Sequence, residues 1–164
     1  MNFKRRWELF IKDPSAVLVF VFVLAYFLVF IWGEQKDSFA IRGTINEIVG
    51  IVLFGMGVAL AFIARKQLGD NWSPSIKIKD EKGKKLITSG LYSKVRHPIY
   101  LSLILMIAGI DLYSFDYVLL GLSAANLIII VVRIEFEEKE LKNRFGDEYY
   151  EYEKKTKKIL PGIY

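Results

Sequence analysis

The chain has 164 residues, no cysteine, one histidine and a net charge of +5, and 53% of its residues are hydrophobic. Without cysteine it forms neither a disulfide nor a thiolate metal site, and with a single histidine no histidine-rich metal centre is expected. The apolar residues come in long blocks, which predicts a chain that folds in a lipid bilayer.

Four apolar segments predict an all-α integral membrane protein with about four transmembrane helices in one domain, residues 1–164. A helix of roughly 20 residues crosses the hydrocarbon core of a bilayer. The predicted spans are residues 14–32, 45–65, 98–111 and 117–134, and the last two form a short hairpin. The first span follows a basic N-terminus and is interpreted as a signal anchor, because its apolar run is too long for a cleaved signal peptide.

Positive charge is concentrated in the N-terminus, in the loop 66–97 and in the tail 135–164, whereas the other two loops are poor in Lys and Arg. The positive-inside rule therefore places both termini and the middle loop in the cytosol. Attraction to anionic lipid headgroups accounts for the basic excess, so no nucleic-acid partner is expected. In the tail, apolar residues at helical spacing predict a cytosolic amphipathic helix that folds back over the hairpin.

Small residues in the second span predict close packing against another helix. Gly55 and Ala59, and likewise Gly57 and Ala61, lie four residues apart on a shared helix face. The segment 111–116 between the last two spans is predicted to be an acidic, outward-facing turn. Because a hairpin returns to the side on which it began, its two outer ends should meet at the cytosolic face.

Two polar clusters stand at these outer ends of the hairpin. The first contains Arg96, His97 and Pro98, and Pro98 is expected at the first turn of the third helix, where free N–H groups favour an anionic ligand group. The second contains Arg133 and the carboxylates Glu135, Glu137 and Glu138.

Taken singly, His97 is typical of a packing residue at the membrane interface. The glutamates, taken singly, are typical of a solvated helix end neutralised by neighbouring lysines. The predicted meeting of the two clusters beside the membrane favours a functional site. Glu135 and Glu138 are not expected to bind a metal, because the matching histidines are absent.

In their order and spacing, these motifs resemble the isoprenylcysteine carboxyl methyltransferase family, whose superfamily also includes phospholipid methyltransferases. The resemblance covers about residues 65–155, and the small number of spans is typical of a prokaryotic-type relative. The matching motifs are Leu68-Gly69-x-x-Trp72, Leu86-Ile87-Thr88-Ser89-Gly90-x-Tyr92-x-x-x-Arg96-His97-Pro98-x-Tyr100, and Arg133-x-Glu135-x-Glu137-Glu138-x-x-Leu141-x-x-x-Phe145-Gly146-x-x-Tyr149-x-x-Tyr152.

The resemblance implies S-adenosylmethionine as cofactor and a lipophilic small molecule or lipidated acceptor that enters from the membrane lipids. The implied cofactor-binding residues are Arg96, His97, Pro98, Tyr100, Glu137 and Glu138. Arg133 is the implied catalytic residue, placed at the substrate end, where it can hold an acceptor carboxylate. The aromatic faces of Tyr100 or Tyr149 can favour the sulfonium of the cofactor.

Two other functions are compatible with parts of the pattern. One is a membrane NADPH-dependent reductase of the sterol reductase type, which resembles the superfamily in its C-terminal region. The other is a non-catalytic helical membrane scaffold. The complete Arg-His-Pro-x-Tyr and Glu-Glu motifs favour methyl transfer. The residues leave the acceptor open among prenylcysteine-like acids, phospholipid amines and other lipophilic molecules, and they leave the oligomeric state open.

Overall fold

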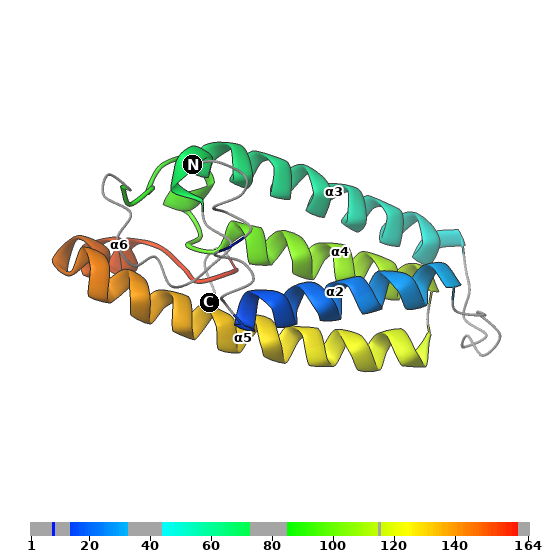
Figure 1. Cartoon of the computed structure of the whole chain (residues 1–164). Coiled ribbons are helices and arrows are strands. Elements are labelled where there is room, and N and C mark those ends of the chain that lie inside the picture. Colours follow the sequence, from blue (N-terminus) through cyan, green and yellow to red (C-terminus); the bar gives the residue numbers. More distant parts are fainter. Residues whose placement is uncertain (1–7, 9–13, 33–43, 73–84, 115, 161–164) are drawn as a thin grey trace.

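The computed structural model describes residues 8, 14–32, 44–72, 85–114 and 116–160 of the chain. Four long helices lie side by side, and a short helix, α6, lies at one end of the bundle (Figure 1). The helices are α2 (Pro14–Trp32), α3 (Thr44–Leu68), α4 (Pro98–Ser114), α5 (Tyr117–Phe145) and α6 (Asp147–Lys155), with two 3-10 turns, η1 (Gly69–Asn71) and η2 (Gly90–Ser93). Within the described residues there is no β-strand beyond a single bridge.

The four long helices begin within a residue of the predicted spans, but three of them continue further. Helix α3 runs to Leu68, α4 to Ser114 and α5 to Phe145. Helix α5 is 29 residues long, or about 43 Å at 1.5 Å per residue, which exceeds a hydrocarbon core of about 30 Å. Its last three turns therefore carry the acidic cluster beyond the predicted span while keeping it on the same rigid helix.

The acidic turn predicted for residues 111–116 is wrong at its first half. Asp111 lies in α4, where its Oδ1 accepts hydrogen bonds from the Tyr26 hydroxyl of α2 at 2.7 Å and from the Ser123 hydroxyl of α5 at 2.9 Å. Because these two donors pair with the carboxylate inside the bundle, Asp111 can lie within a helix instead of in a solvent-exposed turn. The turn is shorter, and Asp116 caps α5 by accepting a hydrogen bond from the backbone N–H of Leu119 at 2.9 Å.

Close packing of the second span is present, and of the two glycines predicted to allow it, Gly57 lies at the contact whereas Gly55 does not. Helices α3 and α4 pack along their length. A Cβ added to Gly50 would lie 2.6 Å from the carbonyl oxygen of Gly109, and one added to Gly57 would lie 2.8 Å from the carbonyl oxygen of Ser102. A Cβ added to Gly55 would meet no atom of another helix within 4 Å, so this position faces away from the bundle. The contact face therefore repeats every seven residues, through Gly50, Gly57 and buried Ala64, instead of every four.

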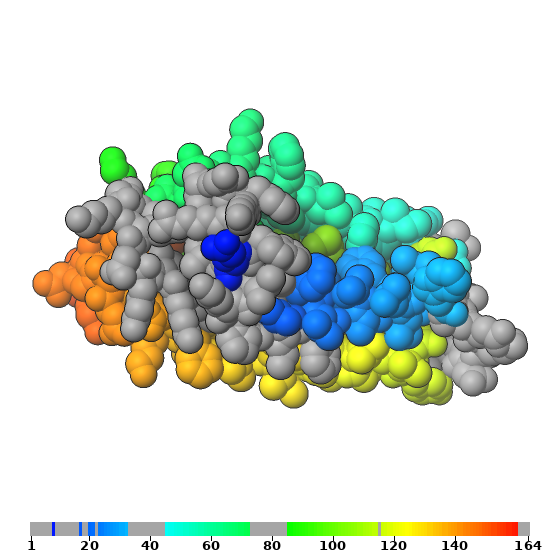
Figure 2. All heavy atoms as spheres, in the orientation of Figure 1, coloured from blue at the N-terminus to red at the C-terminus, as the bar shows by residue number. Residues whose placement is uncertain are grey.

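The exposed surface of the bundle is apolar, as lipid-facing surfaces are. Large hydrophobic side chains of α3 point outward along its length, among them Ile45, Ile51, Met56 and Phe62. Helices α3 and α5 are long and apolar enough to cross a membrane, by length and composition. Figure 2 shows α2 (blue) lying between α3 (cyan to green) and α5 (yellow) on one face.

A sharp turn at Gly146 reverses the chain after α5. Gly146 has φ +52°, a conformation that glycine adopts without steric cost, and its N–H donates to the carbonyl of Lys142 at 2.9 Å. Helix α6 then packs back against α5, with Tyr149 and Tyr152 buried. The reversal covers the outer ends of the α4–α5 hairpin with a segment that lies 50 or more residues beyond His97 in the chain.

Candidate functional site

Arg96, His97 and Glu138 form a buried ionic cluster where α4 begins and α5 leaves the predicted span. The Nε of Arg96 donates to Glu138 Oε1 at 2.8 Å, and His97 Nε2 lies 3.3 Å from the same oxygen. The three residues are at most 8% exposed. The predicted meeting of the basic and acidic ends of the hairpin is therefore present in the structure, across 41 and 42 residues of sequence.

The charges within this cluster stabilise one another. Burial alone would raise the pKa of Glu138, but hydrogen bonds from His97 and Arg96, with the charges of both, lower it to about 2. Burial would lower the pKa of Arg96, but the hydrogen bond and charge of Glu138 raise it. Both groups are therefore fully ionised at neutral pH, in a place where an unpaired charge would be costly.

Residues 156–160 are held against the Arg96–His97 segment, and we refer to them as the C-terminal strap. The backbone N–H of Arg96 donates to the carbonyl of Lys157 at 2.8 Å, and that of His97 donates to the carbonyl of Lys158 at 3.0 Å. A parallel bridge joins Val95 to Lys157. These backbone bonds fix the position at which the Arg96 and His97 side chains enter the cluster.

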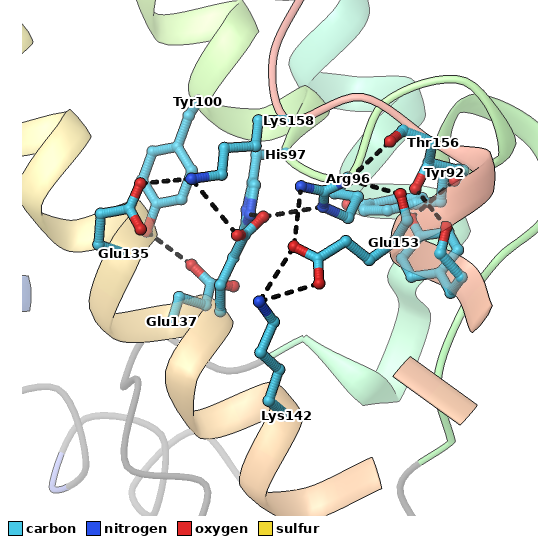
Figure 3. Close-up of polar contacts among 12 residues, drawn as sticks. Tyr92, Arg96, His97, Tyr100, Glu135, Glu137, Lys142, Glu153, Thr156 and Lys158 are labelled. Atoms are coloured by element: carbon cyan, nitrogen blue, oxygen red, sulfur yellow. Dashed lines mark hydrogen bonds and ion pairs between the residues drawn. The ribbon is translucent and has the colours of Figure 1, made fainter. Parts of the chain in front are cut away.

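Backbone carbonyls and side chains of α6 and the strap complete the site, as the close-up shows (Figure 3). The Arg96 guanidinium donates to the carbonyls of Thr156 at 2.6 Å and Glu153 at 3.3 Å. Glu153 also pairs with Lys142 of α5 at 2.9 Å. Lys158 pairs with Glu135 and lies 3.5 Å from Glu138 Oε2.

Glu153, Thr156 and Lys158 were not singled out by the sequence. Tyr149 and Tyr152, one turn apart on α6, are buried and mark the face of this helix that packs against the site. Glu153 lies next to that face.

A second chain of hydrogen bonds joins Arg133 through Tyr100 to Glu137, the residue next to Glu138 on α5. The Tyr100 hydroxyl donates to Glu137 Oε2 at 2.9 Å and accepts a hydrogen bond from the Nε of Arg133 at 2.7 Å. Arg133 is 7% exposed and follows buried Ile130 on α5. The Tyr100 hydroxyl therefore helps to hold the Arg133 guanidinium at the apolar end of the site.

All seven predicted site residues lie in this region. Pro98 is the first residue of α4 and is buried, and the carbonyl of His97 accepts the N–H of Leu101 at 3.1 Å, which starts the helix. Glu135 lies on the exposed side of α5, where its partner is Lys158. Among the described residues no group of three or more His, Asp or Glu side chains is arranged for a metal ion.

An apolar helical bundle with a buried ionic cluster at one end defines an integral membrane protein with a polar site at the end of a helical hairpin. The model of the isoprenylcysteine carboxyl methyltransferase (ICMT) family matches residues 48–143, which include both halves of the cluster. The chain therefore belongs to this family, whose members are methyltransferases of the membrane.

Individual relatives show how far the similarity extends. The chain is 32% identical over 118 residues to the protein-S-isoprenylcysteine O-methyltransferase of Xenopus laevis, an alignment that covers 71% of this chain and 41% of that protein. It is 37% identical over 71 residues to methanethiol S-methyltransferase 1 of Bradyrhizobium diazoefficiens, covering 43% of this chain and 24% of that protein. The chain thus spans less than half the length of these relatives.

Among solved structures, the fold resembles that of a eukaryotic intramembrane Ras methyltransferase, ICMT. The TM-score is 0.68 at 21% sequence identity, and the match covers 99% of this chain and 55% of that structure. At this identity the likeness concerns the fold. It supports the interpretation of the apolar helices as part of a membrane domain.

Proposed function

We propose that this protein is an S-adenosylmethionine-dependent methyltransferase that acts on a lipophilic acceptor in the membrane. One observation carries the proposal: the hairpin brings His97 within 3.3 Å of Glu138 in a buried ionic cluster. Arg133 is linked through Tyr100 to Glu137, which is next to Glu138 in the chain. A polar ligand and an apolar one can therefore bind side by side at the end of the bundle.

The charges of the cluster fit a cofactor that carries both signs. S-adenosylmethionine has an ammonium, a carboxylate and a sulfonium, and the cluster offers ionised Glu138 beside the cations Arg96 and Lys158. Charge-assisted hydrogen bonds to such groups are stronger than neutral ones, most of all where water is excluded. Glu137 and Glu138 can also accept hydrogen bonds from ribose hydroxyls.

The cofactor supplies a methyl group that is already activated by its bond to the sulfonium. The residues of this chain then have to align the acceptor with that methyl group, and no strong base is needed if the acceptor is a carboxylate. Arg133 is suited to hold such a carboxylate, because a guanidinium presents a fork of donors that matches it. The Tyr100 hydroxyl fixes the direction of that fork by accepting from Nε.

The same proposal includes the topology. Helices α2, α3, α4 and α5 cross the membrane, both termini lie in the cytosol, and α6 with the C-terminal strap covers the cofactor site from the cytosolic side. The acceptor enters sideways from the lipid, next to the apolar residues Ile130 and Ile134, which pack with Tyr100. The cofactor enters from the cytosol.

Ligand binding by the purified full chain in lipid nanodiscs tests the proposal. We expect calorimetry to detect binding of S-adenosylhomocysteine and no binding of NADPH. His97→Ala should lose most of that binding while the helical circular dichroism is retained. Binding of NADPH alone would instead indicate a reductase, and absence of any nucleoside binding would indicate a scaffold.

The acceptor class is tested with labelled S-adenosylmethionine and three probes. We expect a farnesylated cysteine with a free carboxylate to gain the methyl group, and its methyl ester to gain none. A long-chain alkane thiol is the third probe, since one relative is named a thiol methyltransferase. Methylation of the thiol alone would show that Arg133 does not serve to hold an acceptor carboxylate.

A further inference from the structure

Tyr149 is a fully buried tyrosine whose hydroxyl has no partner. Its exposed fraction is 0%. Its hydroxyl oxygen is the single buried side-chain polar atom without a hydrogen bond that the structure shows in the described part of the chain. Buried hydroxyl groups are nearly always paired, because an unpaired one loses its hydrogen bonds to water without replacement.

Tyr149 lies on the inward face of α6, the face that completes the ionic cluster. Glu153, one turn later on α6, accepts a hydrogen bond from Arg96 through its carbonyl. Tyr152 lies against the Tyr149 ring, with centroids 5.8 Å apart and ring planes at 75°. The ring of Tyr149 is thus held by its neighbours, while its hydroxyl stays unpaired beside the charged residues of the site.

The charges around this hydroxyl keep it a donor. Burial raises the pKa of Tyr149, and the carboxylates of Glu138, Glu137 and Glu153 raise it further against the opposing charge of Arg96. All four charged residues belong to the site described above. The hydroxyl is therefore neutral and carries a proton that it can give to an acceptor atom.

Packing alone does not explain a tyrosine at this position. A phenylalanine would fill the same space, keep the edge-to-face contact with Tyr152 and avoid burying an unpaired hydroxyl. Tyr152 offers the contrast: its hydroxyl donates to the carbonyl of Tyr92 at 2.7 Å. The fold thus provides a hydrogen-bond partner for the Tyr152 hydroxyl, whereas the described residues provide none for the Tyr149 hydroxyl.

We infer that Tyr149 is a ligand-binding residue whose hydroxyl donates a hydrogen bond to an acceptor atom of the nucleoside cofactor. This inference rests on the proposed function, because it assigns a further contact to the same site. It predicts opposite effects of one substitution on the empty and the loaded protein. Removal of the hydroxyl relieves an unpaired buried group when the site is empty and removes a hydrogen bond when the cofactor is bound.

The test compares Tyr149→Phe with Tyr152→Phe in the full chain in nanodiscs. For Tyr149→Phe we expect the Kd for S-adenosylhomocysteine to rise by about three- to tenfold, the size of one hydrogen bond, while the thermal midpoint of the empty protein does not fall. For Tyr152→Phe we expect the midpoint to fall and the Kd to change less than about twofold.

A second ligand, 5′-methylthioadenosine, shows which part of the cofactor accepts the bond, because it lacks the amino-acid portion. If Tyr149→Phe weakens both ligands equally, the acceptor lies on the nucleoside, and if it weakens only S-adenosylhomocysteine, the acceptor is the carboxylate. An unchanged Kd for both ligands would overturn the inference while leaving the proposed function intact. Failure of the parent chain to bind either ligand would overturn both.

Discussion

Replacement of Glu138 by glutamine should destabilise the protein in a pH-dependent way. The lowering of the pKa of Glu138 from 4.5 to about 2 corresponds to about 3 kcal/mol of extra stability for the ionised carboxylate. Glu138→Gln removes that charge and leaves the Arg96 guanidinium, which is 8% exposed as a residue, without its nearest carboxylate. We therefore expect the free energy of unfolding at pH 7 to fall by about 3 kcal/mol.

The direction of the pH dependence follows from the sign of the pKa change. Because the pKa of Glu138 is lower in the folded state, its contribution is fully present above the unfolded value of 4.5 and is lost as the pH falls toward about 2. The difference in unfolding free energy between the parent and Glu138→Gln should therefore shrink steadily as the pH falls below about 4.5.

Urea titrations in detergent micelles, followed by circular dichroism at several pH values, measure this difference. Glu135→Gln is the matched control on the same helix: its side chain is 56% exposed, and loss of its surface pair with Lys158 should cost less than about 1 kcal/mol. Equal destabilisation by the two substitutions, or a Glu138→Gln effect that persists unchanged at pH 3, would refute the assignment of Glu138 as a buried, paired carboxylate.

Two further substitutions test the Tyr100 connection and the α3–α4 contact. Tyr100→Phe removes the hydroxyl between Glu137 and Arg133. The factor by which kcat falls should therefore be at least about ten times the factor by which the Kd of S-adenosylhomocysteine rises. If Tyr100 served only to bind the cofactor, the Kd would change more than kcat. Gly109→Ala places a Cβ 2.6 Å from the carbonyl oxygen of Gly50 and should destabilise the bundle by about 1–3 kcal/mol in the same urea titration, whereas Gly55→Ala should not, because that position is open.

Much of the candidate site was predictable because it depends on a short hairpin. The hairpin begins at Pro98, and its apolar part ends near Arg133. Because its two apolar segments are joined by a short turn, their outer ends must lie close together. That constraint is local in sequence and places His97 near Glu138 before any side chain is positioned. The family motifs then indicated which polar residues at these ends belong to the site.

The contacts made by α6 and the strap were not predictable, because they depend on the direction in which α6 leaves the turn at Gly146. That direction sets which residues of the tail face Arg96, and it selects Glu153 and Thr156 from a stretch rich in charged residues. The helix ends were misjudged for a related reason: Asp111 is satisfied by Tyr26 of a helix 85 residues away, a partner that no local pattern reveals.

Hydropathy and chain order by themselves determined that the protein is a helical membrane bundle whose polar residues gather at the outer ends of one hairpin, because apolar length and covalent connectivity leave few alternatives. Only the tertiary structure decided how that polar region is built: which carboxylate is buried between Arg96 and His97, which hydroxyl joins Arg133 to Glu137, and which tyrosine hydroxyl has no hydrogen-bond partner. These depend on side-chain packing between distant segments, where differences of an ångström decide which hydrogen bonds form.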